Sequence, residues 1–175
     1  MESYYSLGNS SVLTAEVSRQ VKKNTVATGC CFAEVEVDMK LGKIKVLDIV
    51  NVHDSGILLN PQLAAMQVHG GMSMGMGCGL SEQLLLDEKT GRPLNGTLLD
   101  YKLMTTMDTP DLTAEFVELN DPMGPYGNKA LGEPPAIPGA PAIRNAVLHA
   151  TGIGFAEIPL TPQRLIDGFT KAGLI

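Results

Sequence analysis

The residue with the clearest chemical potential in this sequence is Glu133, in the run Leu131-Gly132-Glu133-Pro134-Pro135. Each proline fixes φ near about −65° and offers no N–H, and Pro134 also favours an extended conformation for Glu133 itself. The glycine lacks a Cβ, so another group can approach the backbone closely. The apolar flanking residues predict partial burial of the carboxylate, which would raise its pKa and suit it to proton transfer.

The same run has a structural interpretation. A Gly-Glu-Pro-Pro sequence is also typical of a loop that starts a helix, where a negative charge near the helix N-terminus is favourable. Perturbed carboxylates occur in structural networks too, so spacing alone does not decide between these roles for Glu133. A hydrolase would need a second carboxylate or a nucleophile–His pair. The nearest carboxylate, Asp121, lies in an irregular stretch with no fixed spacing to Glu133.

Composition limits the kinds of partner. The 175 residues suffice for one domain with a core, and the nine Met must help to fill it because aromatic residues are only 5% of the chain. The formal net charge is −6 and no basic cluster exceeds Lys22-Lys23. We therefore expect neither a nucleic acid nor a membrane as partner. The longest apolar stretch, residues 63–86, is too polar to span a bilayer.

The cysteines and histidines give no metal or disulfide pattern. Cys30, Cys31 and Cys78 are odd in number and two are adjacent, which argues against a disulfide framework. There is no C-x-x-C pair typical of Fe–S clusters or zinc sites, and the three histidines show no ligand spacing, so we predict no metal-ligating side chains. Reduced thiols, and a start without the features of a signal peptide, predict a cytoplasmic protein.

The hydrophobic pattern predicts an α+β fold. Alternating residues indicate a β-hairpin over residues 28–53 and a further strand over 113–119, joined in a mixed sheet. Lys43 and Lys45 are expected to face Glu34 and Glu36 across the hairpin.

Two longer helices and a short C-terminal helix should pack on this sheet. The longer helices are predicted over residues 60–86 and 141–151, and the short one starts at Thr161-Pro162. Residues 1–24 are polar and are predicted to form an extended N-terminal segment of a single domain that spans residues 1–175.

Glycines interrupt the first predicted helix. Each glycine inside a helix costs roughly 1 kcal/mol against alanine, so five of them within residues 70–79 require a compensating contact. Gly71, Gly75 and Gly79 recur every four residues and share one face. That face could serve close packing of another backbone, or it could receive a flat ligand. The pattern leaves both interpretations open.

A second motif, Gln67-Val68-His69-Gly70-Gly71, precedes the Glu133 run. In this order the two motifs resemble those of the molybdenum hydroxylases, the xanthine dehydrogenase and aldehyde oxidase family. The resemblance extends from about Ala15 to Phe169 and covers nearly the whole chain. Its other matching runs are Phe32 to Asp38, Asn60-Pro61, Leu99 to Lys102, and Ala142-Ile143 with Asn145-Ala146.

The resemblance implies roles for individual residues. Gln67 would hydrogen-bond the molybdopterin cofactor, with Gly70 and Gly71 in the same cofactor-binding motif, and Glu133 would be the general base at the molybdenum centre. The implied reaction hydroxylates a carbon of a small-molecule substrate, either a heterocycle such as a purine or an aldehyde. The metal centre would perform the difficult chemistry, and the protein would orient and tune it.

The family's catalytic subunit is several times longer than this chain. The resemblance therefore implies a C-terminal portion of a molybdopterin-binding domain: a natural split subunit, a truncated frame or an expressed fragment. Its expected partners are the rest of the molybdenum subunit and Fe–S and FAD subunits or domains, with a homo-oligomer as the alternative; no Fe–S or FAD site is expected in this chain, which alone should be inactive. A non-catalytic structural domain is the competing hypothesis, and the retention of both Gln67 and Glu133 favours the enzyme.

Overall fold

The computed structural model describes residues 15–18 and 23–175, so most of the predicted segment 1–24 lies outside the described residues. The fold is α+β, as predicted. The elements in chain order are β1 (Thr28–Asp38), β2 (Lys43–Asp54), α2 (Pro61–Leu80), β3 (Leu112–Phe116), the 3-10 turns η1 (Pro125–Gly127) and η2 (Pro134–Ala136), α3 (Gly139–Thr151) and α4 (Pro162–Lys171).

The sheet is mixed, with the strand order β1-β2-β3. β1 and β2 form the predicted antiparallel hairpin, and β3 lies parallel to β2 on its other side. Glu36 lies opposite Lys45 as expected, but Glu34 lies opposite Asp48, because a bulge shifts the register and leaves Leu47 without a partner. The third strand ends at Phe116 rather than at residue 119. Beyond it the Val117 amide still donates to the His53 carbonyl at 2.8 Å, and the Glu118 carboxylate accepts a hydrogen bond from the Leu58 amide at 3.0 Å.

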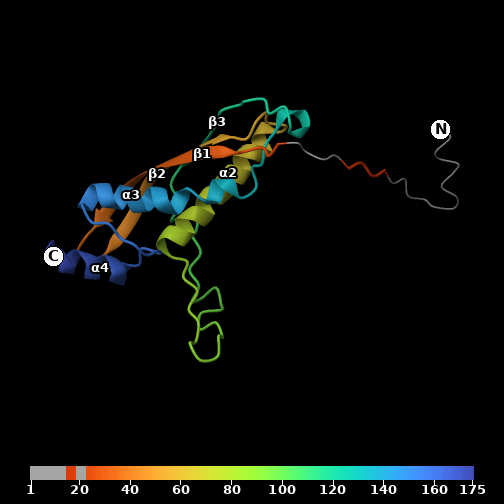
Figure 1. Ribbon diagram of the computed structural model, residues 1–175. Helices are drawn as coiled ribbons and strands as arrows, with labels where there is room; N and C mark the ends of the chain where they lie inside the picture. The colour runs from red at the N-terminus through yellow and green to blue at the C-terminus, as the bar shows by residue number, and fades with distance from the viewer. Residues whose placement is uncertain (1–14, 19–22) are drawn as a thin grey trace, which may run out of the picture.

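One face of the sheet is buried beneath the helices (Figure 1). Alternate residues of the strands supply this face, and α2 and α3 pack against it. The central cluster consists of Val46, Ile49, Val68, Met72, Met76 and Ile143. Apolar burial on this face gives the two-layer fold its stability.

The helices α3 and α4 close one end of the buried face of the sheet. α3 ends at Gly152, whose φ of 76° is left-handed, and α4 begins with the Thr161 side chain accepting a hydrogen bond from the Arg164 amide. Both of these signals were predicted from the sequence. A second core cluster joins the two helices and contains Val147, Phe155, Leu160, Leu165 and Phe169.

The predicted helix over residues 60–86 is too long, because α2 ends at Leu80. The amides of Ser81 and Glu82 both donate to the Gly77 carbonyl, at 2.9 and 2.8 Å, and close the helix. Glu82 folds back over Gly77, where a Cβ would clash with Glu82 Oε1. The chain then runs away from the sheet before it returns as β3 (Figure 1).

The glycine face of α2 packs against this chain's own backbone. A Cβ on Gly71 would lie 2.5 Å from Pro135 Cβ, and one on Gly75 would lie 2.9 Å from the Ala136 oxygen. Gly79 faces Ala140 at 3.3 Å in the same way. Of the two interpretations left open by the sequence, close helix packing is therefore the one that the structure shows for this face. Within the described residues, no helix is both long and apolar enough to cross a membrane.

Candidate functional site

The two sequence motifs meet at one hydrogen bond. Gln67, on the exposed side of α2, donates from Nε2 to the Gly132 carbonyl at 2.6 Å. The helix that presents Gln67 begins at Asn60, whose side chain accepts a hydrogen bond from the Leu63 amide at 3.0 Å, and continues with Pro61. A capped helix start followed by two further turns thus sets the place of the amide.

Pro135 anchors the other end of the Glu133 segment. Its side chain is buried against Gly71, where only a glycine leaves enough space. Its carbonyl accepts a hydrogen bond from Asn51 Nδ2 at 3.0 Å, which links the segment to the central strand β2. The segment is therefore held by Gln67 before Glu133 and by Asn51 and Gly71 after it.

Glu133 itself differs from the expectation in two ways. Its backbone is helical, with φ of −87° and ψ of −29°, and not extended. The Ala136 amide donates to the Glu133 carbonyl at 3.0 Å, and this 3-10 turn outweighs the preference that Pro134 imposes. The side chain is exposed, so the predicted partial burial is wrong for this chain.

The alternative interpretation, in which the Glu133 carboxylate stabilises the start of a helix, also has little support in the structure. Glu133 precedes η2, but its side chain forms no capping hydrogen bond, and α3 begins only at Gly139. The carboxylate is free to contact something outside the described residues.

Gly70 and Gly132, the other glycines of the two motifs, have more open surroundings than Gly71. A Cβ on Gly70 or on Gly132 would meet nothing within 4 Å. Gly70 lies one turn beyond Gln67 on the exposed side of α2, whereas Gly71 is buried beneath Pro135. The structure therefore places Gln67, Gly70, Gly132 and Glu133 at an open surface and Gly71 behind it.

A shallow groove of about 260 Å³ adjoins Gln67. It lies between the start of α2 and residues 128–131, and its lining includes Ser55, Leu63 and Leu131. Beside it, Lys129 Nζ pairs with Asp54 Oδ2 at 2.6 Å, with both side chains 11% exposed. The hydrogen bond from Lys129, followed by one from the Gly56 amide, lowers the pKa of Asp54. This ion pair links the residues that precede Glu133 to the end of β2.

Sequence reasoning missed a row of buried polar residues along the end of β2 and directly after it. Asn51, His53 and Ser55 are at most 3% exposed and follow one another on the buried face. Asn51 Oδ1, both His53 ring nitrogens and Ser55 Oγ have no hydrogen-bond partner among the described residues. Burial lowers the pKa of His53, which favours its neutral form. The available signal was the polar residue at every second position of an apolar strand.

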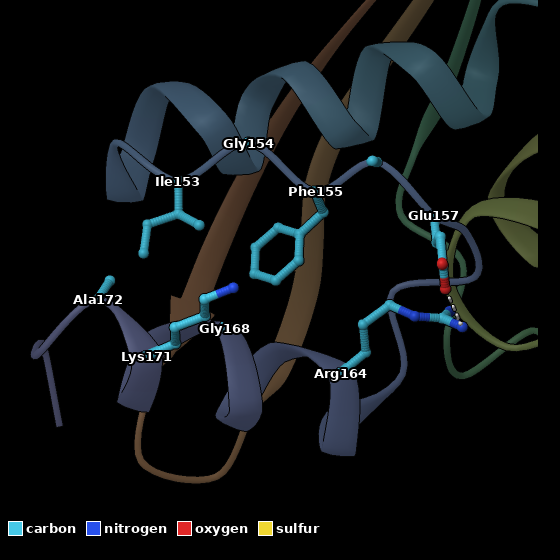
Figure 2. A pocket seen from close by; sticks show the side chains of 9 residues that line it. Ile153, Gly154, Phe155, Glu157, Arg164, Gly168, Lys171 and Ala172 are labelled. Atoms are coloured by element: carbon cyan, nitrogen blue, oxygen red, sulfur yellow. Dashed lines mark ion pairs between the residues drawn. The ribbon is translucent and has the colours of Figure 1, made fainter.

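Another hollow, of about 390 Å³, lies away from these residues between the 153–157 segment and α4. Figure 2 shows Phe155 projecting into it, with Lys171 and Arg164 on the α4 side. Arg164 pairs with Glu157 at 3.2 Å at its rim. None of the residues predicted to form the site lines this hollow. Among residues 15–18 and 23–175, no three His, Cys, Asp or Glu side chains form a cluster that could hold a metal.

Comparison with known proteins identifies the class. The family model of the molybdopterin cofactor-binding domain matches residues 2–110, which is more than half of the chain. The chain therefore belongs to the molybdopterin cofactor-binding domain family. Glu133 lies beyond the matched residues.

Individual relatives match most or all of the chain. It is 50% identical over 175 residues to the putative xanthine dehydrogenase molybdenum-binding subunit XdhA of Escherichia coli (strain K12), covering 100% of this chain and 23% of that protein. It is 34% identical to the aldehyde oxidoreductase molybdenum-binding subunit PaoC of the same organism, over 86% of this chain and 20% of that protein. The chain thus spans less than a quarter of the length of these relatives.

Solved structures agree with this fold. The Cu,Mo-CO dehydrogenase in its carbon monoxide reduced state matches with a TM-score of 0.78 and 28% identity, over 85% of this chain and 19% of that one. The aldehyde oxidoreductase from Desulfovibrio gigas matches with a TM-score of 0.73 and 31% identity, over 82% of this chain and 15% of that one.

Proposed function

We propose that this chain is the part of a molybdenum hydroxylase that supplies the general base, Glu133, and one cofactor contact, Gln67. The observation that carries the proposal is how the short segment around Glu133 is held in place. Its backbone is held on both sides of Glu133, by Gln67 at the Gly132 carbonyl and by Asn51 at the Pro135 carbonyl, while the carboxylate is left exposed. A structural domain has no need to fix a backbone so closely around a free carboxylate.

The residues around Gln67 fit a large polar cofactor. Its Nε2 donates to Gly132, and no hydrogen bond joins its Oε1 to any described residue, so the amide can still accept one from a ligand. Gly70 and Gly132 leave open surface on either side of it. When bound, the molybdenum cofactor supplies the redox chemistry and the oxygen transfer. Gln67 would orient the cofactor by hydrogen bonding, with Gly70 beside it and Gly71 supporting the segment from below.

Glu133 would act as a proton acceptor at its carboxylate oxygens. Because the segment is held at both ends, directing the carboxylate costs little ordering at the moment of reaction. The described residues do not desolvate it, so the water exclusion that a base of this kind needs would come from the rest of the subunit. The substrate class that we propose is a heterocycle such as a purine, or an aldehyde.

The proposal extends to the assembly. Residues 1–175 would form the C-terminal portion of a molybdopterin-binding domain in a cytoplasmic enzyme. The remaining part of the molybdenum subunit would cover the open surface, and Fe–S and FAD subunits or domains would carry the electrons. The coverage of only 23% of the XdhA protein supports a missing covering portion.

The test is Glu133→Gln in the assembled enzyme. This change keeps the shape and removes the base, so kcat should fall by about 10²–10⁴ with cofactor content unchanged. Glu157→Gln is the matched control, because Glu157 is also exposed but lies at the distant hollow, and it should leave kcat unaltered. Retention of more than about a tenth of kcat by Glu133→Gln would contradict the proposal. Loss of cofactor together with activity would indicate a structural role.

A further inference from the structure

Asn51 is a polar residue in the core of the sheet. It lies in the second half of β2, is fully buried, and follows Ile49 of the central hydrophobic cluster on the same face. A buried amide is costly unless it is hydrogen-bonded. Asn51 Nδ2 has such a bond, to the Pro135 carbonyl, whereas its Oδ1 has no partner among the described residues. The contact with Pro135 is therefore what the amide provides at this position.

That contact joins two distant parts of the chain. It connects the central strand to the residue two positions after Glu133, across a sequence separation of 84. Pro135 cannot move away from α2 without leaving its place on Gly71, and Gln67 fixes the Gly132 carbonyl on the other side. Between these points only the Glu133-Pro134 unit spans the gap, and Pro134 has a restricted φ.

We infer that Asn51 is a positioning residue for Glu133, which it serves by fixing the Pro135 carbonyl and thereby the direction of the carboxylate. The inference rests on the proposed role of Glu133 as the base. General stabilisation of the fold explains Asn51 less well. An apolar residue of similar size would leave the Pro135 oxygen unpaired but would also remove the unpaired Oδ1, so the net change in stability should be small.

The test uses Asn51→Leu in the assembled enzyme, with Asn51→Val as a second variant because a β-branched residue suits a strand interior. We expect kcat to fall about 10–100-fold with KM and cofactor content nearly unchanged, since a displacement of about 1 Å can have this effect. We also expect faster amide hydrogen exchange in residues 131–138. This second measurement does not depend on catalysis.

Asn95→Leu is the matched control. Asn95 is likewise buried, donates to the Gln83 carbonyl at 2.6 Å and accepts from the Leu85 amide at 2.8 Å. Its replacement should speed amide exchange in residues 83–95 and leave both kcat and the exchange of residues 131–138 unaltered. If Asn95→Leu lowered kcat as much as Asn51→Leu, the loss would be a general effect of buried-amide removal and the inference would be wrong.

A double variant separates positioning from other effects. If Asn51 acts through Glu133, then Asn51→Leu should cause no further loss of kcat in the Glu133→Gln background. A multiplicative loss would overturn the inference, as would unchanged kcat and exchange in both Asn51 variants. Loss of the folded subunit or of its cofactor in both variants would make Asn51 a structural residue and would overturn it too. If Glu133→Gln alone retained activity, the proposed base would fail instead.

Discussion

The ion pair between Asp54 and Lys129 is the charged contact closest in sequence to the Glu133 segment, and it makes local stability depend on pH. Lys129 lowers the pKa of Asp54 from its ordinary value of 3.8. A lowered carboxyl pKa contributes stability that is fully present above the unfolded value and is lost as the pH falls through the lower folded value. The segment before Glu133 should therefore loosen only in acid.

Asp54→Asn should lower the free energy of unfolding by about 1 kcal/mol at neutral pH. The difference from the unaltered chain should shrink as the pH falls below 3.8. Denaturant unfolding at a series of pH values measures both quantities. Glu157→Gln serves for comparison, because Glu157 is 76% exposed in its pair with Arg164 and such pairs contribute little. A stability difference for Asp54→Asn that grew in acid would contradict the assignment.

At the scale of elements, the contact between α2 and η2 sets the place of the Glu133 segment. Gly71→Ala should destabilise the fold by about 1–3 kcal/mol, because the new Cβ would lie 2.5 Å from Pro135 Cβ and 2.8 Å from its carbonyl carbon. The neighbouring Gly70→Ala should instead stabilise it by up to about 1 kcal/mol, since that Cβ meets nothing within 4 Å and alanine favours a helix. Thermal or denaturant unfolding of the two variants gives the comparison. Equal effects of the same sign would show that the packing is not as described.

Most elements could be predicted because their signals are local. Hydrophobic alternation located the hairpin, Asn60-Pro61 the start of α2, Gly152 the end of α3 and Thr161 the start of α4. The end of α2 was missed because Leu84, Leu85 and Leu86 resume the apolar pattern after the polar residues 81–83. In the structure Glu82 folds back over Gly77, and the helix ends at Leu80.

The candidate site was predictable only in part, because contacts between distant residues leave no local signal in the sequence. Gln67 and Glu133 were predicted as site residues from the resemblance to a family, and that role stays a prediction; the structure places their two motifs in contact. The backbone conformation of Glu133 was predicted wrongly because a local hydrogen bond from the Ala136 amide outweighs the preference that Pro134 imposes. Its exposure was predicted wrongly because none of the described residues covers the side chain, which the Gly-Glu-Pro-Pro run alone does not reveal. Asn51 was missed because its partner, Pro135, is 84 residues away.

At the scale of the whole molecule, exposed apolar side chains mark one side of α2. The glycine face of α2 is covered by η2 and α3, and Met72 and Met76 are buried. The exposed ones lie on the other side of the helix. They are Leu63 at 61%, Met66 at 59% and Met74 at 62%.

We expect the isolated chain to associate through this side of α2, because adjacent exposed apolar residues drive association. Sedimentation at increasing concentration should show oligomers, and Leu63→Lys combined with Met74→Lys should shift the chain towards the monomer. Leu98→Lys combined with Leu99→Lys is the control, since these residues are more exposed, at 77% and 82%, but lie in the segment that leaves the sheet. A strictly monomeric unaltered chain at high concentration would refute the expectation.

The long sequence separation of the two bonds that hold the Glu133 segment has a consequence for folding kinetics. The Gln67–Gly132 bond spans 65 residues and the Asn51–Pro135 bond 84, whereas the β1–β2 hairpin closes through a short turn. Closing a long loop requires its entropy to be lost before the contact forms, so local contacts come first. We therefore expect the hairpin to form early and the Glu133 segment to dock last. Substitutions near the hairpin turn, as at Val37 or Ile44, should then slow folding. Substitutions that remove a contact with the Glu133 segment, at Asn51, Gln67 or Gly71, should mainly speed unfolding.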